Sequence, residues 1–343
     1  MLPVSLLELG RVRQGGTRRE ALDEAREVAR HAEVLGYRRI WVAEHHNMPA
    51  VTTAATSLVI AHLAAGTSTI RVGAGGIMLP NHAPYVIAEQ FGTLATLFPD
   101  RIDLGVGRAP GTDQLTLRAL RRDPSNADRF PDDILELQAY LAPVASGQRI
   151  EAVPGSGTAI PLWILGSSLF GAGLAAELGL PYAFASHFAP QLLDRAIAVY
   201  RARFKPSAQS AAPYVMVGVN VIAAETDDEA RRLWTSQQMS FTGIVRGTRS
   251  LLQPPIDAID DYWSPDEKAY VSQMMSCSVV GSRDSVGAGL QALVDRTRAD
   301  ECIVVSDVYD FALRLRSLVI IAEAARGVRP PAAEGIAQRR LAD

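Results

Sequence analysis

Short apolar runs alternate along the chain with longer segments in which apolar residues recur at helical spacing. The first periodic segment places Ala21, Ala25, Val28 and Leu35 on one face, and Gly36 follows it, a residue type that commonly ends helices. Short apolar runs predict buried strands and periodic segments predict amphipathic helices. Strands are therefore expected over residues 4–9, 39–43, 70–75, 101–106, 161–165, 182–185, 214–223 and 302–305. Helices are expected over residues 21–35, 54–65, 84–98, 130–144, 169–178, 190–204, 284–298 and 311–322, with another starting at Asp227.

Each of the eight predicted strands is followed by a helix. This alternation implies parallel strands joined by right-handed crossovers. Eight such units favour one closed (β/α)8 barrel, in which the active site lies at the C-terminal ends of the strands. A doubly wound dinucleotide-binding sheet would normally carry GxGxxG after its first strand, but here the first strand ends in Glu8-Leu9-Gly10. We therefore expect a single barrel domain over residues 1–343.

Two segments break the alternation. After the fourth strand, residues 112–126 are polar and arginine-rich, and a loop or hairpin rich in Gly and Pro follows at 145–160. After the seventh strand, a long excursion over residues 247–275 contains Pro254, Pro255 and Pro265. Long insertions at a barrel mouth often form active-site lids. We predict insertions after strands 4 and 7, and a candidate lid over about 247–275.

Composition narrows the class of protein. The 343 residues are 48% hydrophobic with a formal net charge of −3 and no basic run, so a nucleic-acid partner is not expected. The two cysteines, Cys277 and Cys302, form no CxxC pair, which argues against a disulfide framework and against a zinc site. The N-terminus lacks a signal-peptide pattern, and the longest apolar segment, at 54–65, is too short to span a bilayer. No metal and no membrane association are expected, and a cytoplasmic location fits best.

The second strand ends in an unusual cluster, Glu44-His45-His46. One interpretation is a metal site, but adjacent histidines on a strand point to opposite faces and the helical HExxH spacing is absent. A second is structural, with these side chains satisfying one another and nearby backbone. The third, which we favour, is an active-site histidine oriented by a carboxylate, a common arrangement for general acid–base chemistry.

Three further strand ends carry candidate binding residues. Gly75 and Gly76 would let the backbone approach a flat ligand, although a bulge or tight bend explains glycines there equally well. Arg108, which follows Gly107, suits an anion. Ser167 and Ser168 precede a helix, where hydroxyl and N–H groups bind phosphate, although Ser168 could be an ordinary N-cap. A phosphorylated planar cofactor such as FMN fits these features, and so does a sugar-phosphate substrate.

The same residues lie in motifs that resemble the bacterial luciferase-like, flavin-dependent monooxygenase family, whose type member is an alkanal monooxygenase. The matches are Trp41-Val42-Ala43-Glu44-His45-His46-Asn47, Gly76-Ile77-Met78-Leu79-Pro80, Asn81-His82-Ala83-Pro84, Ala88-Glu89-Gln90-Phe91, Arg101-Ile102-Asp103-Leu104-Gly105-Val106-Gly107-Arg108, Gly166-Ser167-Ser168 and Val280-Gly281-Ser282. They span essentially the whole chain in the family's order.

The resemblance implies a reduced FMN that reacts with O2 to give a C4a-peroxyflavin, which oxidises a substrate, and a separate reductase that supplies the flavin. It assigns His45 as the catalytic histidine, with Glu44 lining the same pocket. It places a cis peptide bond between Gly75 and Gly76, against the isoalloxazine ring. The phosphate contacts that it implies are Arg108, Arg129, Ser167 and Ser168. Gly107 stands where luciferase has a reactive cysteine, so no thiol-dependent step carries over.

The resemblance also implies a homodimer formed through the helices at 54–65 and 84–98, and a lid over 247–275 that is poorly ordered without ligand. Two other functions stay open. One is a dehydrogenase or reductase that uses the deazaflavin F420, and the other is a non-catalytic flavin-binding protein. The match around Glu44-His45-His46 favours FMN and catalysis. The substrate pocket lies on variable loops, and an apolar or weakly polar small molecule, aldehyde-like or otherwise oxidisable, is expected.

Overall fold

Eight parallel strands close into a barrel in the computed structural model, which describes residues 1–109, 112–248 and 250–331. The ring runs β1–β2–β3–β4–β5–β6–β7–β9 and back to β1, with every pairing parallel. Its strands are β1(Val4–Glu8), β2(Arg39–Val42), β3(Arg71–Met78), β4(Ile102–Gly107), β5(Leu162–Gly166), β6(Tyr182–Phe184), β7(Val215–Ala223) and β9(Glu301–Val305). The predicted (β/α)8 barrel is confirmed.

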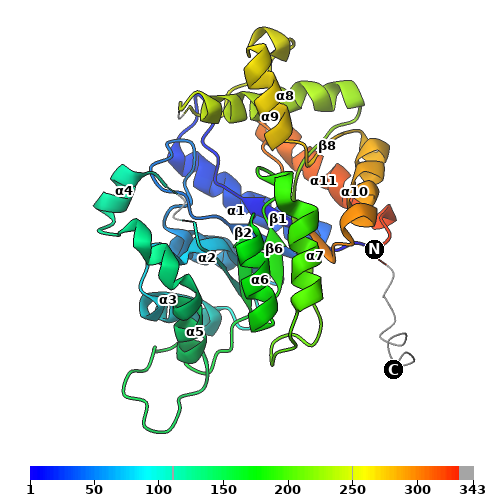
Figure 1. Ribbon diagram of the computed structural model, residues 1–343. Helices are drawn as coiled ribbons and strands as arrows, with labels where there is room; N and C mark the ends of the chain where they lie inside the picture. The colour runs from blue at the N-terminus through cyan, green and yellow to red at the C-terminus, as the bar shows by residue number, and fades with distance from the viewer. Residues whose placement is uncertain (110–111, 249, 332–343) are drawn as a thin grey trace, which may run out of the picture.

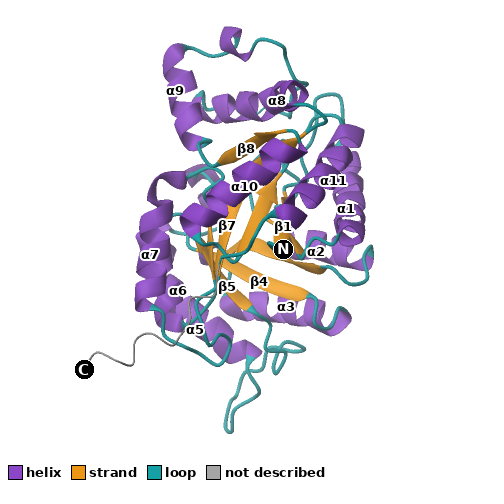
Figure 2. Cartoon of the chain, turned by 90° about the vertical axis from the view of Figure 1, so that its right-hand side faces the viewer, coloured by secondary structure: helices purple, strands orange, loops and turns teal. Residues whose placement is uncertain are grey.

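Helices surround the strands (Figures 1 and 2). Those that follow the ring strands are α1(Arg18–Leu35), α2(Thr56–Ala65), α3(Pro84–Leu97), α5(Phe130–Leu141), α6(Leu169–Leu178), α7(Leu193–Arg203), α8(Asp227–Val245) and α11(Phe311–Gly327), and α10(Arg283–Thr297) precedes β9. The start and end of α1 show why the pattern predicts it so closely. Thr17 and Glu20 form a reciprocal capping box, and Gly36 ends the helix with a φ of 82°, a conformation that favours glycine.

Both predicted insertions are present. After β4 the chain forms α4(Gln114–Ala119) and the 3-10 helix η2(Pro124–Arg129) before α5 begins. The polar stretch at 112–126 is thus partly helical, with the Asp113 side chain accepting the N–H of Thr116 at 2.9 Å as an N-cap. Residues 145–160 form turns without regular structure, as predicted.

The insertion after β7 corrects the strand count. It holds η4(Ile259–Asp261), α9(Pro265–Met274) and a ninth strand, β8(Ser278–Gly281), which the sequence pattern does not predict. β8 pairs with Asn220–Ala223 at the far end of β7, outside the closed ring. β8 has four residues, three of them only half-buried, so it lacks the continuous apolar run that marks the ring strands. Figures 1 and 2 show α8 and α9 together at one end of the barrel.

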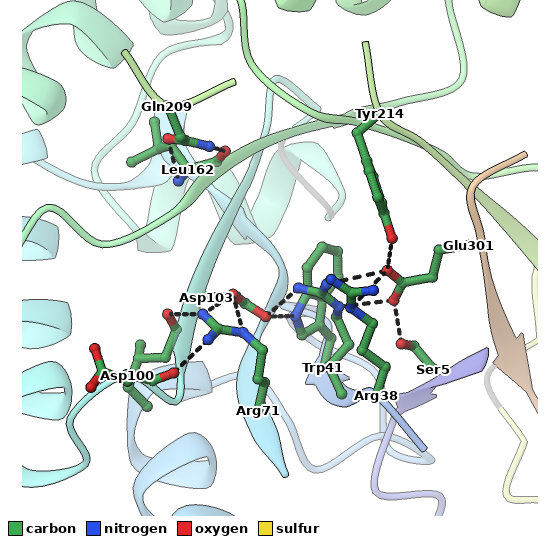
Figure 3. A network of polar contacts seen from close by, with 12 residues as sticks. Ser5, Arg38, Trp41, Arg71, Asp100, Asp103, Leu162, Gln209, Tyr214 and Glu301 are labelled. Carbon is green, nitrogen blue, oxygen red and sulfur yellow. Dashed lines mark hydrogen bonds and ion pairs between the residues drawn. The ribbon is translucent and has the colours of Figure 1, made fainter. Parts of the chain in front are cut away.

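A buried ionic network fills the N-terminal end of the barrel (Figure 3). Arg39 binds Asp103 at 2.7 Å and Glu301 at 2.8 Å, and the Trp41 indole donates to Asp103 at 3.1 Å. The Tyr214 hydroxyl donates to Glu301 at 2.8 Å. Because this end of a (β/α)8 barrel serves stability and the opposite end serves chemistry, these charged residues are structural.

Two further features concern membrane-spanning helices and the two cysteines. No helix of the described residues is both long and apolar enough to cross a membrane. Cys277 and Cys302 are buried free thiols, and burial raises the pKa of each of them.

Candidate active site

The predicted site residues gather on four neighbouring strands at the C-terminal end of the barrel. Glu44 and His45 follow β2, and Gly75 and Gly76 lie in β3. Gly107 ends β4 and Arg108 follows it, while Ser167 and Ser168 follow β5. Since β2, β3, β4 and β5 are successive in the ring, these positions form one continuous wall of the mouth. Pro110 and Gly111, which come shortly after Arg108 in the chain, lie outside the described residues.

Glu44 is fully buried and surrounded by donors. Its carboxylate accepts from His46 Nε2 at 2.8 Å, His82 Nε2 at 2.9 Å, Asn81 Nδ2 at 3.0 Å and the Met78 backbone N–H at 2.9 Å. Burial raises the pKa of Glu44, but the hydrogen bonds from His46 and His82 outweigh it, so the pKa falls to about 2. The carboxylate is therefore ionised, and it links the end of β2 to the turn after β3.

Glu44 does hold a histidine of the cluster, but that histidine is His46 and not His45, the residue that the resemblance assigns to catalysis. Glu44 and His46 are two residues apart, a spacing that can bring two side chains to one side of the chain, and no hydrogen bond joins Glu44 to His45 among the described residues. The histidines that Glu44 holds are His46 and His82. His82 was not predicted as a site residue. Its place in the motif directly after the third strand could have marked it as one, because residues after the strands of a barrel lie at the mouth.

His45 is half-buried, and its Nδ1 is enclosed without a hydrogen-bond partner. Burial lowers the pKa of His45, and the positive charge of Arg11 lowers it further. Arg11 itself forms an ion pair with Asp307 at 3.2 Å and donates to Ser240 Oγ at 3.0 Å. His45 is therefore a neutral imidazole at neutral pH, a state that can accept a proton.

The Gly75–Gly76 peptide bond is cis, as the resemblance implies. The register between β3 and β4 shifts between Gly75 and Ile77, so the alternative of a bulge at these glycines is also correct. A Cβ at Gly76 would lie 2.8 Å from the Gly105 carbonyl oxygen. A side chain there would collide with backbone, so packing of the barrel wall by itself requires glycine at this position.

An anion site with the right chemistry lies at the start of α6. Ser168 is the N-cap residue, yet its side chain makes no capping hydrogen bond, so the ordinary N-cap interpretation does not account for its hydroxyl. Arg108 is exposed, and its guanidinium lies 4.3 Å from the ring centroid of Phe170, in the first turn of α6. Helix N–H groups, a hydroxyl and a guanidinium are the groups that bind a phosphate dianion, so these residues fit the phosphate of FMN.

The fourth predicted phosphate contact, Arg129, lies on the insertion after β4. Arg129 ends η2, its side chain is 69% exposed, and it lies 3.7 Å from Asp133 one helical turn later. Within the parts of the chain that are described, no three His, Cys, Asp or Glu side chains are arranged to hold a metal ion.

Two distant structures show which ligands this fold accommodates in other proteins. The oxygenating constituent of 3,6-diketocamphane monooxygenase from Pseudomonas putida, a complex with FMN, superposes with a TM-score of 0.71 at 19% identity over 96% of this chain and 99% of that one. An F420-dependent secondary alcohol dehydrogenase with an F420–acetone adduct gives 0.65 at 14% identity, covering 96% and 99%. At these identities the likeness establishes the fold.

Closer relatives establish the family. The family model described as luciferase-like monooxygenase matches residues 3–300. The luciferase-like monooxygenase of Escherichia coli (strain K12) is 50% identical over 314 residues, which is 91% of this chain and 94% of that protein. The crystal structure of apo-MsnO8 superposes with a TM-score of 0.89 at 39% identity, covering 96% and 100%. The chain therefore belongs to the luciferase-like monooxygenase family.

Proposed function

We propose that this protein is an FMN-dependent monooxygenase that receives reduced flavin from a separate reductase and uses O2 to oxidise a small apolar or weakly polar substrate, aldehyde-like or otherwise oxidisable. The observation that carries the proposal is the anion site at the start of α6, where the Ser168 hydroxyl makes no cap and Arg108 lies beside the first turn. This site and the neutral His45 lie on the same continuous wall of the mouth.

Arg108, Ser167 and Ser168 would hold the phosphate, and Gly75, Gly76 and Gly107 would leave backbone free of side chains for the flat ring. When bound, the reduced flavin supplies the electrons that activate O2. Arg129 would add a second positive charge on the phosphate side. That requires Arg129 to exchange its ion pair with the buried Asp133 carboxylate for the phosphate.

The His45 imidazole would carry out proton transfer in this reaction. Its neutral state at pH 7 makes it a proton acceptor. Glu44 would be a positioning residue. Its hydrogen bonds join His46, His82 and the Met78 N–H into one cluster and thereby position the segment that carries His45. A site that would use a reduced flavin and O2 must exclude water, and this cluster links the end of β2 to the turn after β3.

The test is an anaerobic titration with reduced FMN and, separately, with reduced F420, followed by mixing of the tighter complex with oxygenated buffer. Tighter binding of FMN with flavin-dependent O2 consumption supports the proposal. Tighter binding of F420 without reaction with oxygen would make the protein a deazaflavin dehydrogenase or reductase. A His45→Ala variant that binds FMN but no longer turns over supports catalysis, whereas identical activity removes His45 from the reaction.

The segment 247–275 is our candidate lid, with residue 249 outside the described range. It contacts the segment that follows β1, where the Leu252 N–H donates to the Val12 carbonyl at 3.0 Å. Arg246 also binds Glu267 at 2.7 Å, which ties the end of α8 to α9. We expect hydrogen exchange in this segment to slow markedly when flavin binds. Equal exchange rates with and without flavin would contradict a lid.

We also propose a cytoplasmic homodimer that pairs through α2 and α3. These helices carry apolar side chains that are largely exposed, namely Leu58 at 71%, Leu97 at 62% and Val86 at 41%. Exposed apolar side chains gathered on neighbouring helices mark association surfaces. Sedimentation showing a dimer that Leu58→Glu converts to monomer would support this interface. A monomer at micromolar concentration in the wild type would refute it.

A further inference from the structure

A second histidine, His187, stands opposite His45 at the mouth. It lies three residues beyond the end of β6, so it belongs to the C-terminal rim of the barrel. In the closed ring of eight strands, β2 and β6 are four positions apart in either direction. Strands so related face each other across a barrel. The rim segment with His187 therefore faces the one with His45, and the two imidazoles are close enough to influence each other electrostatically.

The ring of His187 has one nitrogen against the wall and one toward the mouth. A Cβ on Gly218 would lie 2.5 Å from His187 Nδ1, so the glycine in β7 makes room for the imidazole. Nδ1 is enclosed and has no hydrogen-bond partner. The His187 side chain is half-buried, and its Nε2 atom is neither enclosed nor hydrogen-bonded to any described residue. Nε2 is thus the nitrogen that reaches the accessible surface.

A chain of buried hydrogen bonds holds the backbone that carries this ring. Asn220 Nδ2 donates to the His187 carbonyl at 2.6 Å, and Gln237 Nε2 donates to Asn220 Oδ1 at 2.8 Å. The Ser186 hydroxyl donates to the Gly218 carbonyl at 2.6 Å. The segment after β6 is therefore fixed to β7 and to α8, which covers this end of the barrel. A side chain supported in this way is suited to precise binding.

The surroundings of the two imidazoles favour a neutral partner. Burial, together with the nearby His45, lowers the pKa of His187 to about 3, so both rings are uncharged at neutral pH. Arg11 is paired with Asp307, and Glu44 is saturated with donors. A carboxylate or ammonium group between the rings would lose its hydration without gaining a counter-charge. A carbonyl, carboxamide or hydroxyl group pays no such penalty.

We propose that His187 is a substrate-binding residue which, with His45 across the mouth, holds a neutral oxygen-bearing group of the substrate through Nε2 hydrogen bonds. This inference rests on the proposed function, because it takes the space between the two histidines as the substrate side of a flavin site. The inference narrows the substrate class to neutral carbonyl, carboxamide or hydroxyl compounds. It excludes carboxylic acids and amines of the same chain length as substrates.

The test uses two matched eight-carbon probes, octanamide and octanoate, whose dissociation constants are measured by calorimetry with and without FMN. Wild type, His187→Phe and His62→Phe are compared. Phe keeps the ring shape and removes the nitrogens, and His62, on α2, is a matched control with an enclosed unpartnered nitrogen away from the mouth. We expect wild type to prefer octanamide. His187→Phe should bind it roughly threefold to tenfold more weakly, the loss of one neutral hydrogen bond.

A second measurement does not depend on any variant folding. The chain has six histidines, so nitrogen-15 spectra of histidine-labelled wild type resolve each ring. Octanamide should shift the His187 Nε2 resonance and leave that of His62 unmoved. An unmoved His187 resonance, octanoate binding as tightly as octanamide, or no octanamide binding at all would each overturn the inference.

FMN affinity, measured on the same samples, separates this inference from the proposed function. Retained FMN binding in His187→Phe with weaker octanamide binding supports both. Retained FMN binding with unchanged octanamide affinity refutes the role of His187 alone. Wild type that binds octanamide selectively but does not bind FMN refutes the proposed cofactor. A large loss of FMN affinity in His187→Phe would make His187 a cofactor contact and so overturn its role as a substrate contact.

Discussion

Replacing Glu44 with Gln tests whether its buried carboxylate organises the mouth. The side chain is fully buried and accepts hydrogen bonds from two histidines, an amide and a backbone N–H. A pKa of about 2 in place of the usual 4.5 corresponds to about 3 kcal/mol of stabilisation at neutral pH. Because the pKa of the folded state is depressed, this stabilisation is present above pH 4.5 and disappears as the pH falls toward 2.

The assay is urea unfolding of wild type and Glu44→Gln at pH 7 and at pH 3. We expect the variant to lose about 3 kcal/mol at pH 7, since it loses the charge and turns an amide NH2 toward existing donors. The difference should shrink markedly at pH 3. Glu323→Gln, at an exposed position on α11, is the matched control and should change stability by less than about 0.5 kcal/mol.

A Glu44→Gln loss below about 1 kcal/mol at pH 7, the size expected of one ordinary hydrogen bond, would refute this reasoning. So would a difference between the two proteins that is the same at pH 3 as at pH 7. Either result would mean that the donors around Glu44 are equally well satisfied by water or by one another.

Three substitutions probe the phosphate site, the glycines of β3 and the buried ionic network. Arg108→Ala and Ser168→Ala should each weaken FMN roughly tenfold and leave riboflavin affinity unchanged, since they act on the phosphate; fluorescence titration with both flavins checks this, and equal losses for the two would contradict it. Gly76→Ala should lower the thermal midpoint and impair flavin binding, because the new Cβ would lie 2.8 Å from the Gly105 carbonyl oxygen; calorimetry showing an unchanged midpoint would disprove the clash. Arg39→Met should destabilise the protein by about 3 kcal/mol, because it removes the buried guanidinium shared by Asp103 and Glu301 and leaves them only the more exposed Arg71 and Arg38; a neutral effect on urea unfolding would show that the network at the barrel base is dispensable.

The elements predicted best are those whose own residues determine them. The boundaries of α1 follow from the Thr17–Glu20 capping box and from Gly36, all local features. The ring strands are continuous apolar runs because both of their faces are buried. β8 was missed because its four residues pair at the end of β7, where three of them stay half-exposed. Nothing in such a short half-buried segment separates a strand from a loop.

The candidate site shows the same division. Barrel topology assigns residues after strands to the mouth, so Glu44, His45, Arg108 and Ser168 could be named from their positions along the chain. Which of them touch could not be read in this way. His82 reaches Glu44 only because β3 runs beside β2 in a defined register, and a sequence read by itself does not contain that register.

By itself, then, the sequence determined the (β/α)8 architecture, the end of the barrel that carries the chemistry, and the residue types available there, because hydrophobic period and order along the chain are local properties. Only the tertiary structure decided that Glu44 binds His46 and His82 in place of His45, and that His187 stands opposite His45. Those relations depend on closure of the ring, which brings β2 and β6 face to face across the barrel although about 140 residues separate them along the chain.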